Sequence, residues 1–251
     1  MLLVALLLAA GPDAERMEWK VDGVAREALV VAPSKDREGG APIVFGFHGH
    51  GGSMRNAARS FAFEKHWPEA VVVYPQGLPT PGRLSDPEGK RPGWQHGIGE
   101  QGDRDLKFFD EMLATLKMKF KIDEKRIYAS GHSNGGQFSY LLGGARRQML
   151  AAIGPSAAAG ARFVKEPCPI LHVMGRKDPL VTPAMQERSL AAMKALNACE
   201  EQGKDWDKGC LEYASSKDAP LVTFIHDGDH AYPSEAPALI VKFFKGQARK
   251  P

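Results

Sequence analysis

The sequence predicts an α/β domain, with a mainly parallel central sheet, an antiparallel hairpin at its N-terminal edge and helices on both faces. Short apolar runs alternate with longer segments of helical periodicity between residues 43 and 244, the order of elements that builds parallel sheets. Before them, two strand-like segments, 17–21 and 24–31, are joined by Asp22-Gly23, a pair suited to a two-residue hairpin turn. A chain of 251 residues is long enough for one such domain, which we expect over 15–251.

The alternation can be followed along the chain. The expected strands are 43–47, 70–74, 126–130, 151–155, 170–174 and 221–225, and the expected helices are 54–66, 103–120, a helix from Asn134 onward, 183–197 and 236–244. Each helix shows apolar residues at three- and four-residue steps, so one face of it should pack on the sheet. Residues 75–102 are rich in Gly and Pro and show no period, which predicts a long loop of the kind that often carries function.

The first eleven residues, MLLVALLLAAG, form an apolar run. The run is too short to span a bilayer but has the length of the hydrophobic region of a secretory signal. We therefore expect a signal peptide over 1–14, a secreted or periplasmic protein and no stable insertion in a membrane. The formal net charge of +3 comes from basic residues spread along the chain without a block, so we expect no nucleic acid partner.

The chain contains three cysteines, Cys168, Cys199 and Cys210. Cys199 and Cys210 flank a polar segment, and in an exported protein a disulfide between them would close a short loop and leave Cys168 as a free thiol. Three reduced cysteines in a cytoplasmic protein are the alternative.

The segment GHSNGG, residues 131–136, lies between a predicted strand and a predicted helix. Glycines on both sides of Ser133 suit a sharp strand-to-helix elbow that exposes a nucleophilic hydroxyl group. An inert serine in a glycine turn is the alternative. A serine hydroxyl needs a histidine base within hydrogen-bond reach and a carboxylate that orients it.

Two candidate partners for Ser133 follow later strands, in the order that this kind of site requires. Asp178 follows the strand 170–174 in GRKDPLV, and His230 follows the strand 221–225 in HDGDHAYP. Asp178 could instead cap the next helix, and His226 competes with His230 but lies closer to the strand. Because carboxyl ends of parallel strands share one edge of a sheet, we expect Ser133, Asp178 and His230 to meet there.

A glycine-rich loop, FHGHGGS, follows the strand 43–47. Acyl transfer needs backbone N–H donors for the oxyanion, and we expect the N–H groups of His50 and Asn134 to supply them. Such a loop could also cradle a phosphate, but no G-x-x-x-x-G-K-[ST] or G-x-G-x-x-G motif occurs.

Together, the motifs HGHGGS, GHSNGG, GRKDPLV and GDHAYP, in their order along the chain, resemble the secreted serine esterases grouped with polyhydroxybutyrate depolymerases and with feruloyl and acetyl-xylan esterases. The resemblance runs from about residue 17 to residue 244 and implies the α/β-hydrolase fold. It also implies an acyl-enzyme mechanism on small or polymeric esters without a cofactor. Ser133, Asp178 and His230 occupy the positions of the family's triad, and Cys199 and Cys210 fall where many relatives have a cysteine pair.

Two aromatic residues are candidates for the substrate pocket. Relatives often have Trp two residues after the catalytic histidine, where this chain has Tyr232, and the segment around Trp94 matches them loosely. Both offer a flat apolar surface with a polar group, although core packing is the alternative for Trp94.

Two other functions remain open at this stage. His48, His50, His226 and His230 could ligate a metal in a metal-dependent hydrolase, although their spacing is poor and we expect no metal site. A non-catalytic binding protein could share the fold, but such proteins usually lose a member of the triad.

Overall fold

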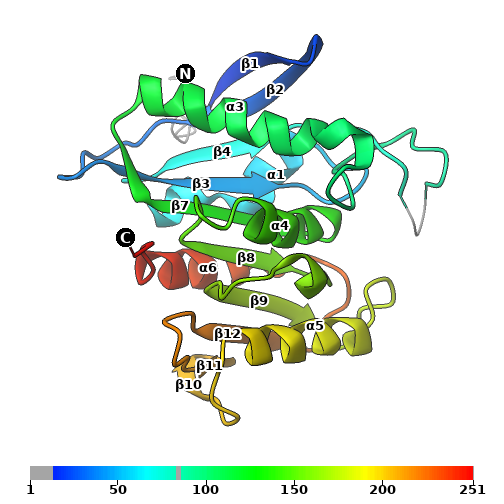
Figure 1. Cartoon of the computed structure of the whole chain (residues 1–251), viewed down its shortest axis with the longest axis vertical. Helices are drawn as coiled ribbons and strands as arrows, with labels where there is room; N and C mark the ends of the chain where they lie inside the picture. Colours follow the sequence, from blue (N-terminus) through cyan, green and yellow to red (C-terminus); the bar gives the residue numbers. More distant parts are fainter. Residues whose placement is uncertain (1–13, 83–85, 251) are drawn as a thin grey trace, which may run out of the picture.

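A ten-stranded sheet runs through the computed structural model, which describes residues 14–82 and 86–250 (Figure 1). Its strands, in spatial order, are β1 (Glu15–Val21), β2 (Val24–Val31), β4 (Val71–Pro75), β3 (Ala41–Phe47), β7 (Ile122–His132), β8 (Ala152–Ser156), β9 (Ile170–Gly175), β12 (Leu221–His226), β11 (Cys210–Tyr213) and β10 (Lys204–Asp207). The strands from β4 to β12 are parallel, and the pairs at both edges are antiparallel. The predicted mainly parallel sheet with an N-terminal hairpin is confirmed.

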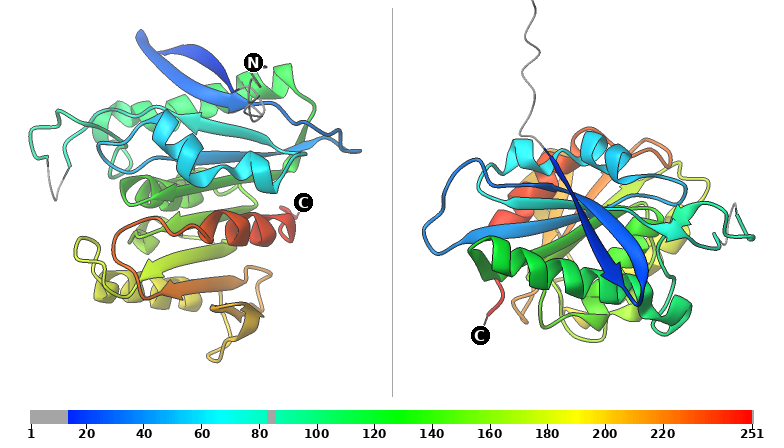
Figure 2. Two further views of the ribbon diagram at one scale, coloured as in Figure 1. Left: turned by 180° about the vertical axis from the view of Figure 1, so that it is seen from behind. Right: turned by 90° about the horizontal axis from the view of Figure 1, so that it is seen from above.

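Helices cover both faces of the sheet, as predicted. One face carries α3 (Arg104–Lys119), α4 (Asn134–Ala145) and α5 (Pro183–Leu196), and the other carries α1 (Met54–Phe61), α2 (Phe63–His66) and α6 (Ala236–Lys245) (Figures 1 and 2). Two 3₁₀ turns, η1 (Glu100–Asp103) and η2 (Ala161–Phe163), precede α3 and follow β8. No helix of the described residues is long and apolar enough to cross a membrane.

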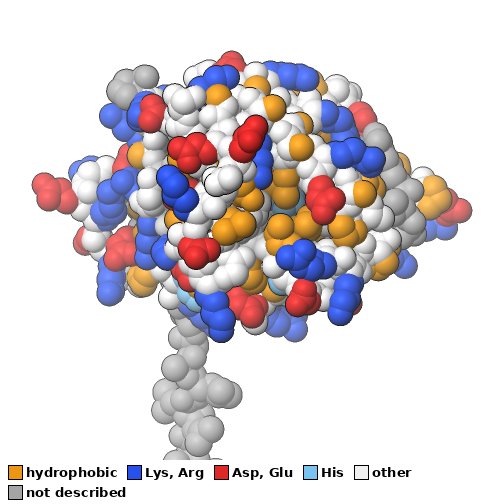
Figure 3. Space-filling model, turned by 90° about the horizontal axis from the view of Figure 1, so that it is seen from below, with side chains coloured by type: hydrophobic (Ala, Val, Ile, Leu, Met, Phe, Trp, Pro, Cys, Tyr) orange, Lys and Arg blue, Asp and Glu red, His pale blue; other side chains and the backbone are white. Residues whose placement is uncertain are grey.

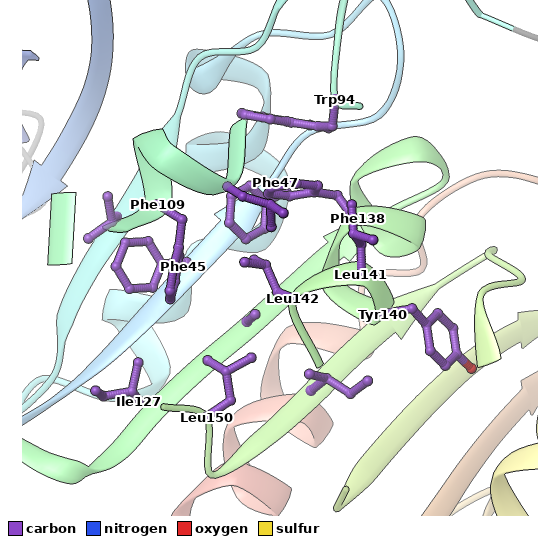
Figure 4. Packing of buried hydrophobic residues seen from close by; sticks show 14 of the residues in the cluster. Phe45, Phe47, Trp94, Phe109, Ile127, Phe138, Tyr140, Leu141, Leu142 and Leu150 are labelled. Atoms are coloured by element: carbon purple, nitrogen blue, oxygen red, sulfur yellow. The ribbon is translucent and has the colours of Figure 1, made fainter. Parts of the chain in front are cut away.

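The strand periodicity explains the two cores. Along β3, Phe45 and Phe47 point to the α3–α4 side and join Phe109 and Phe138 (Figure 4). Val44, which precedes Phe45 in the strand, belongs to the core on the α1–α6 side. Successive strand side chains face opposite ways, so a strand buried on both faces is apolar throughout. The outer surface differs: seen from the β10–β11 end, hydrophobic side chains gather near the middle and charged side chains of both signs surround them (Figure 3).

Two predicted elements differ in the structure, and one hairpin was not predicted. The expected helix 54–66 is two helices, because Ala62 adopts a left-handed conformation with φ of 40° between α1 and α2. The expected loop 75–102 contains a short antiparallel pair, β5 (Leu78–Pro79) with β6 (Pro92–Gly93). The hairpin β10–β11 was not predicted, because KDWD and CLEY lack the apolar alternation that marks a strand.

The predicted disulfide between Cys199 and Cys210 is wrong for this structure, in which Cys168, Cys199 and Cys210 are all free. Cys210 belongs to the core on the α1–α6 side of the sheet, whereas Cys199 packs against the core on the other side. Side chains on opposite faces cannot approach to bonding distance without movement of the backbone. The predicted signal peptide, 1–14, lies outside the described residues except for Ala14.

Candidate active site

Ser133 lies on the sharp turn between β7 and α4. Its φ of 55° and ψ of −118° fall in a region that residues other than glycine rarely adopt, so the turn is strained. The Ser133 N–H donates to the carbonyl of Ser156 on the neighbouring strand β8 at 2.8 Å, which holds the turn in place. The hydroxyl group therefore faces a cavity at the carboxyl ends of the parallel strands.

The glycines of GHSNGG are required by close backbone contacts. A Cβ atom on Gly131 would lie 2.8 Å from the carbonyl oxygen of Phe47, and one on Gly136 would lie 2.7 Å from that of Ser156. A Cβ on Gly135 would overlap the Phe47 carbonyl. The elbow is thus wedged against β3 and β8, and a side chain at any of the three positions would push it away from them.

His230 connects Ser133 to Asp178. The hydroxyl group of Ser133 lies 2.9 Å from His230 Nε2, and His230 Nδ1 lies 2.8 Å from Asp178 Oδ2. An ionised carboxylate only accepts hydrogen bonds, so Nδ1 carries the proton and Nε2 accepts from the serine. Asp178 has no exposed side-chain surface, while His230 retains 20%. The three residues that the sequence singled out are therefore hydrogen-bonded in the order that proton transfer from serine requires.

His226, the competing histidine, does not reach Ser133. Its Nδ1 instead accepts the N–H of Gly228 at 3.1 Å, in the loop that leads on to His230. The four extra residues let the chain turn back over the strand ends.

Asp178 is held by further donors besides His230. Its Oδ1 accepts the N–H groups of Leu180 and Val181, each at 2.9 Å, and Gln186 Nε2 donates to Oδ2 at 3.2 Å. Asp178 therefore does not cap α5, because the N-cap residue of that helix is Thr182. Asp178 instead binds the loop that precedes the helix. These hydrogen bonds fix the position of the carboxylate that His230 contacts.

Behind Asp178, a fully buried chain of hydrogen bonds continues into the core. Gln186 Oε1 must accept, so His172 Nε2, at 3.0 Å, donates to it and His172 Nδ1 accepts from the Tyr140 hydroxyl group at 2.9 Å. Burial lowers the pKa of His172 to about 4, so this imidazole is neutral. No sequence pattern predicted this network, because Tyr140, His172 and Gln186 lie on three different elements.

His132 lies beside the base inside GHSNGG. Its ring centroid is 5.0 Å from that of His230, and burial, followed by the proximity of His230, lowers the pKa of His132 to about 4. A neutral His132 adds no positive charge next to His230. Its Nδ1 lies 3.2 Å from the Ser156 hydroxyl group, which links the elbow to β8 a second time.

The cavity in front of Ser133 has a volume of about 360 Å³ and is lined by both residues expected to supply oxyanion donors, His50 and Asn134. Within 14–82 and 86–250, neither backbone N–H has a hydrogen-bond acceptor. The rest of the lining is mainly apolar and includes Leu180, Val181 and Met185. Two unpaired N–H groups beside a serine are what a developing oxyanion requires.

The side chains of His48 and Trp94 hold the backbone around the two candidate oxyanion donors, which we call the oxyanion side. His48 Nδ1 donates to the Gly49 carbonyl at 2.8 Å and its Nε2 accepts the Gly77 N–H at 3.0 Å; burial lowers its pKa to about 4. Trp94 Nε1 donates to the His48 carbonyl at 2.8 Å, and the Trp94 N–H donates to Asn134 Oδ1 at 2.7 Å. Trp94 thus ties the glycine-rich loop to the residue after Ser133.

The predicted pocket role of Trp94 is wrong, because its side chain is fully buried and does not line the cavity. Trp94 packs against Phe47 and Phe138, with ring centroids 5.1 and 5.4 Å away (Figure 4). Tyr232 lines a second cavity of about 180 Å³ that shares Gly49, His50 and His132 with the first. Its hydroxyl group is buried and has no partner among the described residues.

The histidines considered as metal ligands do not converge. Both ring nitrogens of His48 have partners, His50 Nε2 lies 2.9 Å from the carbonyl of Thr80, and His226 binds its own loop. In the part of the chain that the structure describes, no group of three or more His, Cys, Asp or Glu side chains could hold a metal ion.

Two groups of known proteins are similar to this chain. It is 27% identical over 194 residues to a bifunctional acetylxylan esterase/xylanase from Neocallimastix patriciarum. The aligned region covers 72% of this chain and 25% of that protein. It is 29% identical over 133 residues to a probable feruloyl esterase C from Aspergillus clavatus, which covers 51% of this chain and 44% of that protein. The chain thus matches less than half the length of these two relatives. No protein-family model matches it.

Solved structures show the same fold. A ferulic acid esterase from Anaeromyces mucronatus superposes with a TM-score of 0.65 at 16% identity, covering 94% of this chain and 90% of the other. An S-formylglutathione hydrolase from Agrobacterium tumefaciens gives 0.65 at 15% identity and covers 92% and 94%. The chain has the α/β-hydrolase fold, as its motifs implied.

Proposed function

We propose that this protein is a serine carboxylic-ester hydrolase that works through an acyl-enzyme, with 15–251 as one catalytic domain. The observation that carries the proposal is the chain of hydrogen bonds from Ser133 through His230 to Asp178. Ser133 faces a cavity whose lining includes the two residues with unpaired backbone N–H groups. The similarity to acetylxylan and feruloyl esterases supports the same chemistry.

Each group has one role in the reaction. Ser133 Oγ attacks the ester carbonyl carbon while His230 Nε2 takes the hydroxyl proton, and the N–H groups of His50 and Asn134 bind the oxyanion. His230 then donates the proton to the leaving alcohol, which departs as the acyl-enzyme forms. Water repeats the sequence with His230 as base and releases the acid. Asp178 fixes the tautomer and stabilises the imidazolium.

The substrate is a carboxylic ester, small or part of a polymer. The mainly apolar cavity suits an acyl group of modest size, and the curated relatives are named for feruloyl and acetylated xylan esters. Polyhydroxyalkanoate esters are the third class, on the resemblance of the motifs. Secretion fits such substrates and rests on the apolar run at 1–11.

Neither rival function gains a specific observation. A metal-dependent hydrolase would need a converging ligand set, and the candidate histidines point to different partners. A binding protein on this fold would not need an elbow strained at Ser133 and aligned with a base.

The test is turnover of p-nitrophenyl acetate and p-nitrophenyl butyrate by the purified protein, with Ser133→Ala as the comparison and Ser139→Ala as the matched control. Ser139 is buried on α4 and donates to the Gly135 carbonyl, away from the cavity. We expect Ser133→Ala to lose about 10⁴-fold or more in kcat and Ser139→Ala to keep most of it. A folded wild-type protein that turns over neither ester contradicts the proposal.

A further inference from the structure

We propose that the hollow beside the catalytic cavity binds a carboxylate, so that the preferred ester is one that carries a negative charge away from the scissile bond. The inference rests on the proposed function and names the substrate class of the same site.

The hollow lies between η2 and α5 and has a volume of about 360 Å³. It shares Ala159, Arg162 and Met185 with the cavity that Ser133 faces. The two spaces are therefore neighbours along one wall, and a molecule held at Ser133 can extend from one into the other.

The charge of this region has one sign. Arg162 and Arg188 line the hollow, and none of the described residues that line either space is Asp or Glu. Arg188 has no hydrogen bond or ion pair with another residue of 14–82 and 86–250. A guanidinium with no internal partner next to an active site has its full set of N–H donors available to a ligand.

Arg162 lies against an aromatic ring. Its guanidinium carbon is 4.2 Å from the centroid of the Phe163 ring. This contact holds the positive charge of Arg162 beside the hollow, where it attracts an anion. The same ring restricts the rotamers of Arg162, which lowers the entropy lost on binding.

Ser189 supplies a neutral donor at the same place. Its Oγ accepts the N–H groups of Gly160 and Ala161 at 3.0 and 3.3 Å, and the side chain is buried at 8% exposure. The hydroxyl hydrogen is donated to no other described residue. A hollow with two guanidinium groups, one unused hydroxyl donor and no carboxylate is a receptor for an anion.

The anion can belong to either half of the ester. A carboxylate on the acyl half is found in half-esters of dicarboxylic acids, and one on the alcohol half is found in esters of acidic sugars or at the free end of a hydroxyacid oligomer. Both present the same group to Arg162 and Arg188, so two pairs of substrates distinguish them.

The experiment measures kcat/KM for a charged ester divided by kcat/KM for its neutral methyl ester. The acyl pair is p-nitrophenyl hemisuccinate and p-nitrophenyl methyl succinate; the alcohol pair is para-acetoxybenzoate and its methyl ester. Wild type is compared with Arg188→Gln and with Arg162→Gln/Arg188→Gln. The control is Arg16→Gln, which removes the same charge from an exposed side chain on β1, at the far edge of the sheet.

We expect the ratio for one pair to fall about tenfold in Arg188→Gln and about a hundredfold in the double variant, and to stay unchanged in Arg16→Gln. Added salt should lower the wild-type ratio, because the attraction is between exposed charges. The inference is wrong if both ratios in a folded double variant stay within about twofold of wild type. Wild type that hydrolyses none of the four esters refutes the proposed function itself, and the inference with it.

Discussion

Ser133 lies between two supports that are built differently. On one side, the acid–base partners His230 and Asp178 are side chains, and the Gln186 side chain and two backbone N–H groups hold Asp178. On the other side, the candidate oxyanion donors are backbone N–H groups, which any residue except proline could supply, and the side chains of His48 and Trp94 hold that backbone. On the first side, a substitution changes a group that takes part in the reaction. On the second side, a substitution changes a side chain that only positions the backbone N–H groups.

This contrast predicts a very large effect on the acid–base side. Asp178→Asn leaves one acceptor oxygen where four donors now point, and an amide N–H₂ group cannot accept from His230 Nδ1. The imidazole would take the wrong tautomer, and we expect kcat for p-nitrophenyl acetate to fall about 10⁴-fold. The matched control is Asp229→Asn, in the same loop as His230, where the carboxylate accepts the Ala231 N–H and no other hydrogen bond from the described residues. A folded Asp178→Asn enzyme that keeps a tenth of wild-type kcat would contradict the assignment.

On the same side, the buried His172 should affect how the stability of the protein depends on pH. His172 is neutral when folded, with a pKa near 4, but in the unfolded chain it binds a proton below its ordinary pKa of 6.5. The stability that His172 provides is therefore complete above pH 6.5 and is lost as pH falls toward 4, by about 3 kcal/mol. His172→Gln removes this dependence, so its free energy of unfolding should fall less than that of wild type between pH 7 and pH 4.

Urea unfolding followed by circular dichroism at the two pH values measures that difference. The low pKa values of His48 and His132 remain in the variant, so the variant still loses some stability in acid. His66→Gln, at the exposed end of α2, is the control and should match wild type. Equal losses in His172→Gln and wild type would show that His172 is not held neutral in the folded protein.

The oxyanion side should give the smallest effect. Trp94→Phe removes the hydrogen bond from Nε1 to the His48 carbonyl but keeps an aromatic ring packed against Phe47 and Phe138. A less precisely held loop should lower kcat about tenfold and leave KM nearly unchanged, since a missing oxyanion donor costs more than a displaced one. Steady-state kinetics on p-nitrophenyl butyrate separate the two constants. Trp67→Phe, in the core on the other face, should keep wild-type kcat; a fall in KM alone for Trp94→Phe would argue against the bracing role.

The two sides also differ in how far the sequence predicts them. Ser133, Asp178 and His230 could be found because each follows a recognisable strand, and the carboxyl ends of parallel strands meet. Trp94 was misplaced, because a sequence does not distinguish an aromatic residue that lines a pocket from one that is buried behind it. Gln186 and His172 were missed for a similar reason: their contact joins α5 to β9 and has no local pattern.

The edges of the sheet repeat this lesson. The hairpin β1–β2 was predicted from Asp22-Gly23 and the apolar residues beside it, whereas β10–β11, at the other edge, has polar residues on both faces. Edge strands of that kind form because a neighbouring strand offers hydrogen bonds, and this is tertiary information. The predicted disulfide was wrong for the same reason, since the spacing of two cysteines does not tell which face of the sheet each thiol occupies.

The central claim is that Ser133 is a nucleophile activated by His230. The most direct measurement is reaction of the purified protein with a fluorophosphonate, with the modified peptide located by mass spectrometry and p-nitrophenyl butyrate turnover followed in parallel. The account predicts one adduct per chain, on Ser133, loss of turnover in proportion, and much slower labelling in His230→Ala. An adduct on another residue, or full labelling without loss of turnover, would contradict it.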